Sequence, residues 1–184
     1  MPLELERAIV EAALLGGNDA LDSLIVEVWP EAYRLSFAIL RDRGLAEDAA
    51  QEACAAIARA LPSLKEIDAF AAWSYKIIVN HALAVARRRR HTLSIETEGD
   101  RETHADRSDA LDLYDALASL TPLQRSVILL HYYAGLSSRE IAAATNLPAS
   151  TVRFHLMQAR RALRKALSVS TGPRDRNEVL SDAR

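Results

Sequence analysis

Two helix-start patterns in the second half of this chain constrain its fold more than any other feature. Thr121-Pro122-Leu123-Gln124 and Ser137-Ser138-Arg139-Glu140 each place a hydroxyl residue three positions before Gln or Glu, which is the pattern of a capping box. Pro122 suits the first turn of a helix, and Gly135 is typical of the end of one. The sequence therefore predicts that one helix ends near Gly135 and a new one starts two residues later.

Residues 136–163 are typical of a helix-turn-helix. We expect a short helix over residues 137–145, a turn at Asn146-Leu147-Pro148 and a longer helix from Ser150 to Leu167. One stripe of the longer helix is apolar and comprises Val152, Leu156, Ala159 and Leu163. Ile141 and Leu147 are its expected packing partners. The opposite face carries Ser150, Arg153, Phe154, Met157, Gln158 and Arg161.

The first half of the chain is also expected to be helical. Tyr33, Phe37 and Leu40 fall on one face of a helix, which we expect Gly44 to interrupt. Further helices are expected over residues 46–60 and 69–90, separated by a short polar loop at residues 62–68. Apolar residues make up 49% of the chain and aromatic residues only 5%, which argues against a β-sandwich or barrel. The predicted class is all-α.

Charge is divided into blocks along the chain. Residues 1–31 and 94–115 each have a net charge of −6, whereas residues 71–93 and 149–167 each have +5 and contain no acid. Basic helices without acids favour contact with nucleic acid, because Lys and Arg release counterions from phosphates. Two alternative interpretations stay open. The basic segments are also compatible with ordinary solvated helix faces, and residues 136–163 are also compatible with an ordinary antiparallel helix pair that does not bind DNA.

Several classes of function find no support in the sequence. Cys54 is the only cysteine and is expected to be buried, and the five histidines lie scattered without ligand spacing, so we expect neither a metal site nor a cofactor. No catalytic constellation is evident, and the protein is predicted not to be an enzyme. No stretch approaches the roughly 20 apolar residues of a membrane span. The acidic N-terminus is unlike a secretion signal, so a cytoplasmic location is expected.

The ordered set of motifs resembles a bacterial RNA polymerase sigma factor of the extracytoplasmic-function (group IV) type. Ala46-Glu47-Asp48-Ala49-Ala50-Gln51-Glu52, the Phe70–Tyr75 segment, Asn80 and the arginine run are similar to the family's region 2. The segments from Leu120 to Arg125, from Gly135 to Ala142 and from Pro148 to Leu163 are similar to region 4.

The resemblance implies a role for each surface. Region 2 would dock on the clamp helices of core RNA polymerase through Asp48, Gln51 and Glu52. It would capture the melted −10 element with Ser63, Lys65, Glu66, Lys76, Asn80, Arg87, Arg88, Arg89 and Arg90. Region 4 would contact the polymerase flap. It would read the −35 element with Ser150, Thr151, Arg153, Phe154, Gln158, Arg160 and Arg161.

The resemblance also implies an order of domains. A region 2-like domain is expected over residues 1–91, a flexible acidic linker over 92–109, a region 4-like helix-turn-helix domain over 110–168 and a disordered tail over 169–184. The two helical domains are expected to move independently without a partner, and an anti-sigma factor is expected to hold the protein inactive. Two alternatives are a helix-turn-helix transcription regulator and a sigma mimic that titrates an anti-sigma factor.

Overall fold

The computed structural model describes residues 7–93 and 116–170, and every regular element in these ranges is helical. The first unit contains α1 (Arg7–Leu14), α2 (Asn18–Leu40), α3 (Arg43–Ala60), the 3₁₀ turns η1 (Leu61–Ser63) and η2 (Ile67–Ala69), and α4 (Phe70–Leu93). The second contains α6 (Pro122–Ile128), the π-helical turn η3 (Leu129–Tyr133), α7 (Ser138–Thr145) and α8 (Ala149–Ser170). The all-α prediction is confirmed.

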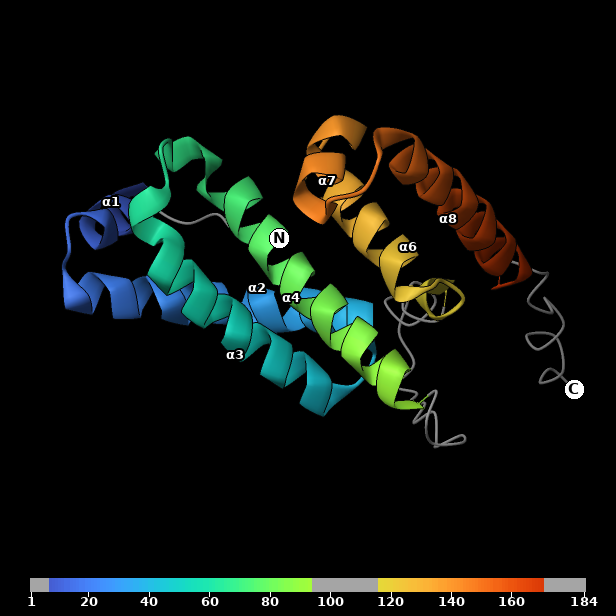
Figure 1. Ribbon diagram of the computed structural model, residues 1–184, viewed down its shortest axis with the longest axis horizontal. Coiled ribbons are helices and arrows are strands. Elements are labelled where there is room, and N and C mark those ends of the chain that lie inside the picture. The colour runs from blue at the N-terminus through green and yellow to red at the C-terminus, as the bar shows by residue number, and fades with distance from the viewer. Residues whose placement is uncertain (1–6, 94–115, 171–184) are drawn as a thin grey trace, which may run out of the picture.

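In the first unit, α3 and α4 run beside each other and pack on the long helix α2 (Figure 1). Leu24, Val28 and Ile39 of α2 are fully buried in this core. Alanines dominate the buried face of α3, which lets the helices approach closely. Trp73 is partly buried there, with its ring centroid 5.8 Å from that of Phe70.

The break between the first two long helices lies earlier than predicted. We expected Gly44 to interrupt the helix, but α2 ends at Leu40 and Arg41 adopts the left-handed conformation (φ 56°). The Asp42 side chain then accepts a hydrogen bond from the Leu45 backbone nitrogen at 3.0 Å and caps α3. Gly44 lies within the first turn of α3 because this cap, rather than glycine, determines where the helix begins.

The helix-turn-helix forms as predicted. Both capping boxes are present, with Thr121 paired to Gln124 and Ser137 paired to Glu140. The helix after Pro122 does not stay regular up to Gly135: it widens into η3, and Gly135 follows with φ 69°. The predicted helix end near Gly135 is confirmed, but its last turn is π-helical, since the backbone nitrogens of Ala134 and Leu136 donate to the carbonyls of Leu129 and Leu130.

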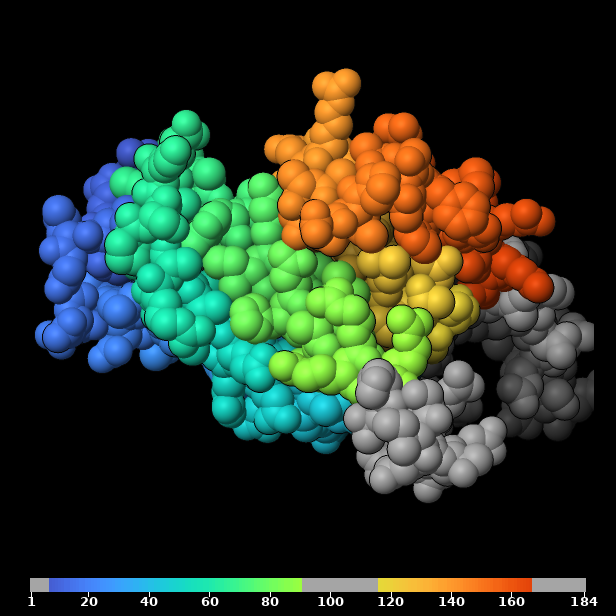
Figure 2. All heavy atoms as spheres, in the orientation of Figure 1, coloured from blue at the N-terminus to red at the C-terminus, as the bar shows by residue number. Residues whose placement is uncertain are grey.

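The two units pack against each other, which differs from the expectation of independent domains. The rings of Tyr75 on α4 and Tyr133 on η3 are 5.8 Å apart, and Tyr133 also hydrogen-bonds with the buried Glu31 of α2. Burial and this carboxylate raise the pKa of Tyr133. Figure 2 shows atoms of α7 lying directly on atoms of α4. Buried apolar residues of both units therefore form one continuous core.

The expected boundaries fall close to the ends of the described helices. α4 continues to Leu93, two residues beyond the expected end of the first domain, and α8 continues to Ser170. Most of the expected linker (92–109) and tail (169–184) lies outside the described residues.

Candidate nucleic-acid interface and docking groove

The first candidate surface is the outward face of α8, here called the recognition face. Val152, Leu156 and Ala159 are buried, and they hold α8 against α6 and α7. The left-handed Asn146 (φ 54°) ends α7 and allows the sharp turn into α8. The predicted apolar stripe is thereby confirmed, and it fixes which side chains of α8 face outward.

The predicted DNA-reading residues largely lie on this recognition face. Exposed among them are Ser150, Arg153, Phe154, Gln158, Arg160 and Arg161, whereas Thr151 is half-buried. The Arg160 guanidinium lies 5.4 Å from the centroid of the Tyr132 ring, a cation–π distance. A convex helix face with arginines, an amide and no acid matches the hydrogen-bonding groups of a major groove.

The second surface is a groove of about 750 Å³ between the start of α3 and the end of α4, here called the docking groove. It is lined by Asp42, Gly44, Leu45, Asp48, Gln51, Glu52, Val85, Arg88 and Arg89. All three residues predicted to dock on the polymerase lie here, together with two arginines predicted to bind DNA. Sequence reasoning missed Asp42 as a member of this site, because its role depends on where α4 packs.

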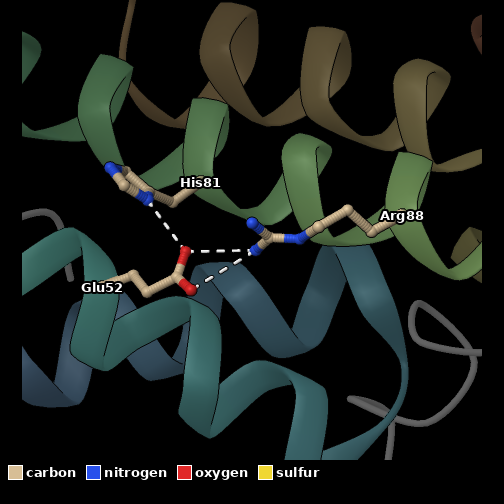
Figure 3. Close-up of polar contacts among 3 residues, drawn as sticks. All are labelled: Glu52, His81 and Arg88. Atoms are coloured by element: carbon tan, nitrogen blue, oxygen red, sulfur yellow. Dashed lines mark hydrogen bonds and ion pairs between the residues drawn. The ribbon is translucent and has the colours of Figure 1, made fainter.

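The Glu52 carboxylate contacts two residues of α4 (Figure 3). Its carboxylate oxygens accept hydrogen bonds from one Arg88 nitrogen at 3.2 and 3.4 Å, and Nδ1 of His81 lies 3.4 Å away. The hydrogen bond from Arg88, followed by that of His81, holds the pKa of Glu52 below its usual value. These contacts orient the Glu52 carboxylate towards α4.

The third surface is the loop that joins α3 to α4, formed by η1 and η2. Ser63, Lys65 and Glu66, predicted to receive the −10 strand, are all exposed on it. The Ser63 hydroxyl donates to the Ala60 carbonyl at 2.6 Å, and an ion pair of 2.5 Å joins Asp68 to Arg7 of α1. Helix α1, for which we made no prediction, thus helps to hold this loop.

The remaining −10 candidates lie on α4, and two of them face the second unit. The Asn80 side-chain nitrogen donates to the Ala144 carbonyl at 2.7 Å. Lys76 is half-buried, and its charge contributes to lowering the pKa of Glu140 on α7, after the hydrogen bonds from Ser137. Arg87 and Arg90 are exposed at the end of α4. The structure therefore divides these candidates among an exposed loop, an inter-unit contact, the docking groove and the exposed end of α4.

The described ranges hold neither a metal-binding cluster nor a membrane-spanning helix. Within residues 7–93 and 116–170, no three His, Cys, Asp or Glu side chains lie close enough together to hold a metal ion. In the same ranges no helix combines the length and the apolar character that crossing a bilayer requires.

Comparison with known proteins assigns each of the two units to a region of the sigma-70 family. The family model for sigma-70 region 2 matches residues 24–92, and that for sigma-70 region 4 matches residues 110–163. The chain is 32% identical over 182 residues to the RNA polymerase sigma-H factor of Pseudomonas aeruginosa, covering 89% of this chain and 94% of that protein. It is 29% identical to the ECF RNA polymerase sigma factor SigC of Mycobacterium tuberculosis, covering 87% and 90% of the two chains.

The fold matches a solved complex. The sigma factor RpoE bound to the anti-sigma factor NepR, from Bartonella quintana, aligns with a TM-score of 0.65 at 22% identity, covering 80% of this chain and 96% of that one. Region 2 matches the unit that holds the docking groove, and region 4 matches the unit that holds the helix-turn-helix. The chain belongs to the extracytoplasmic-function (group IV) sigma factors of bacterial RNA polymerase, and it is an alternative sigma factor, not an enzyme.

Proposed function

We propose that the three surfaces divide the work of promoter recognition. The docking groove, with Asp48, Gln51 and Glu52, binds the clamp helices of core polymerase, while region 4 contacts the flap. The loop formed by η1 and η2 captures the melted −10 strand, and the recognition face of α8 reads the −35 element. Polymerase supplies the chemistry, and this chain supplies the choice of start site in the cytoplasm.

The recognition face is the observation that carries this proposal. The buried stripe fixes the rotation of α8, so that Arg153 and Gln158 both project into solvent. Arginine can donate two hydrogen bonds to guanine, and glutamine can pair with adenine. Arg160, Arg164 and Lys165 follow along the same helix, where phosphate contacts would set the register on the duplex. A helix that carries base-reading side chains followed by phosphate-contacting ones suits direct readout of a short DNA element.

The −10 element demands a different mode of recognition. A base taken out of the stack costs a few kcal/mol, so the protein must offer a receiving surface for it. Most side chains of the loop at residues 61–69 are exposed, and the loop is fixed at both ends by α3 and α4. Its position next to α4 supports a role in holding one melted strand, with Lys76 and Asn80 reaching the same strand once α7 has moved away.

An anti-sigma factor is the proposed regulator. The solved RpoE complex contains the anti-sigma factor NepR, and a second similar structure, with a TM-score of 0.58, contains CnrH with the cytosolic domain of CnrY. In this chain α7 packs on α4, where the Ala144 carbonyl accepts a hydrogen bond from the Asn80 side chain and Lys76 is half-buried. A regulator that stabilised this packed arrangement would hold Lys76 and Asn80 against α7 and so limit their contact with DNA.

Size-exclusion chromatography with core polymerase tests the proposal. The protein should co-elute with core polymerase, and the complex should protect a promoter fragment from nuclease. Alone, it should leave duplex DNA unprotected at the same concentration. Strong protection of duplex DNA by the free protein, without binding to core polymerase, would instead indicate a conventional helix-turn-helix regulator.

A further inference from the structure

The last turns of α4 carry four consecutive arginines, Arg87, Arg88, Arg89 and Arg90. Successive residues of an α-helix are about 100° apart, so such a run surrounds the helix axis. Arg88 and Arg89 point to neighbouring sectors, whereas Arg87 and Arg90 lie about 60° apart on the opposite side. One helix end therefore presents two pairs of positive charges in two directions.

One pair faces α3 across the docking groove. The Arg88 guanidinium contacts both carboxylate oxygens of Glu52, at 3.2 and 3.4 Å. The Arg89 guanidinium lies 3.1 Å from Oδ2 of Asp42, whose other oxygen caps the backbone of Leu45. Both arginines line the groove that also holds Asp48 and Gln51. Each of them thus fixes a carboxylate at one end of the proposed polymerase-docking site.

The other pair has a different setting. Arg87 and Arg90 are exposed, and neither forms an ion pair with another residue of the described ranges. Neither lines the docking groove. Their guanidinium groups are held by no carboxylate of α3, so they can contact phosphates without first breaking an ion pair.

We propose that the arginine run is divided between two partners. Arg88 and Arg89 are positioning residues that orient Glu52 and Asp42 for core polymerase, whereas Arg87 and Arg90 contact the phosphates of the melted promoter strand. This assignment rests on the proposed function, and it replaces the sequence-based expectation that all four arginines bind DNA. It makes the docking groove a mixed-charge surface, suited to a partner helix that presents both acidic and basic side chains.

Two double variants with the same change in charge separate these roles. R88Q/R89Q removes the pair in the groove, and R87Q/R90Q is the matched control on the opposite side of the helix. Because exposed ion pairs contribute modestly, we expect R88Q/R89Q to weaken binding to core polymerase about threefold to tenfold. R87Q/R90Q should leave this affinity unchanged. Circular dichroism of both variants should show wild-type helix content.

DNA binding is measured with the variants at saturating core polymerase, on a promoter with a pre-melted −10 region. Each phosphate contact to a single strand contributes about 0.7 to the slope of log K against log salt concentration. R87Q/R90Q should therefore reduce the slope by about 1.4, and R88Q/R89Q should leave it unchanged. Equal effects of both variants in both assays, or the reverse pattern, would overturn the division.

A double-mutant cycle tests whether Arg88 acts through Glu52. R88Q should weaken polymerase binding in the wild-type background and have no further effect in E52Q. Equal losses in the two backgrounds would refute the positioning role. A wild-type protein that bound neither core polymerase nor promoter DNA would contradict the proposed function itself. This outcome differs from a failure of the arginine division or of the positioning role, in which the wild-type protein still binds both partners.

Discussion

The side-chain nitrogen of Asn80 on α4 lies 2.7 Å from the carbonyl oxygen of Ala144 on α7, and this hydrogen bond joins the two sigma regions. Asn80 is one of the residues predicted to contact the −10 strand. In the packed arrangement one donor of its amide is used within the protein, although the residue is exposed. DNA binding through this donor therefore competes with the contact between α7 and α4.

Asn80→Ala should shift the protein towards separated units. A typical hydrogen bond stabilises a contact by about 0.5–1.5 kcal/mol, so we expect the ratio of packed to separated molecules to fall about twofold to tenfold. Single-molecule fluorescence energy transfer between dyes on introduced cysteines at exposed positions 47 and 164 would measure this ratio. Gln51→Ala, which lies in the docking groove between α3 and α4, is the control. An unchanged transfer distribution in Asn80→Ala would show that this hydrogen bond does not hold the units together.

Arg153→Ala should weaken recognition of one base pair in the −35 element. Loss of a bidentate contact to a base edge costs about 1–3 kcal/mol, and Gln158→Ala should behave in the same way at another position. Binding of the polymerase complex to a library of −35 variants would locate the affected base. Arg164→Ala, further along α8, should instead weaken binding to all sequences alike. A uniform loss in Arg153→Ala would mean that Arg153 contacts phosphate.

Two neighbouring residues of α8 should differ sharply in their effect on folding. Leu156 is 4% exposed and packs in the core, whereas Met157 is 58% exposed. Leu156→Ala should lower the free energy of unfolding by about 2–5 kcal/mol, because it leaves a cavity. Met157→Ala should change it by less than about 0.5 kcal/mol. Urea unfolding followed by circular dichroism measures both, and similar losses in the two variants would contradict the observed rotation of α8.

Cys54 should make the stability of the protein depend on pH in alkaline solution. Burial raises the pKa of its thiol to about 11. An unfolded chain ionises this thiol near pH 8.5–9, while the folded chain keeps it protonated. The stabilisation is thus complete below about pH 9 and is lost as the pH rises to about 11, by about 2 kcal/mol.

Cys54→Ala provides the control for this effect. Urea unfolding between pH 8 and 11 should show a steeper fall in the wild-type protein than in Cys54→Ala. The native wild-type protein should also react with a thiol reagent far more slowly than the urea-unfolded chain. Parallel stability curves, or fast modification of the native protein, would show that the thiol is accessible.

The features that could be predicted from the sequence depend on local interactions. The capping boxes at Thr121 and Ser137 need only residues within one turn, and the apolar stripe of α8 follows from helical spacing. The predicted DNA-reading residues therefore lie on its outward face, apart from the half-buried Thr151. The end of α2 at Leu40 lies earlier than predicted. The prediction relied on Gly44 as the helix break, whereas the Asp42 cap determines where the next helix starts.

Other features depend on contacts between distant segments. Nothing in the spacing of Tyr75 and Tyr133 indicates that their rings meet, or that Glu31 joins them in a buried contact. The roles of Arg87 to Arg90 could not be predicted from the sequence either, because four consecutive arginines differ only in what surrounds each of them once α4 is packed. The position of α3 separates Arg88 and Arg89 from Arg87 and Arg90, and this could not be inferred before the helices were placed.

The most direct test of the central claim is to map where RNA synthesis begins. Core polymerase is incubated with genomic fragments, with and without the purified protein, and the 5′ ends of the transcripts are sequenced. We predict new start sites that share −10 and −35 elements and that disappear with a −35 substitution or with Arg153→Ala. Start sites that are the same with and without the protein would contradict the account.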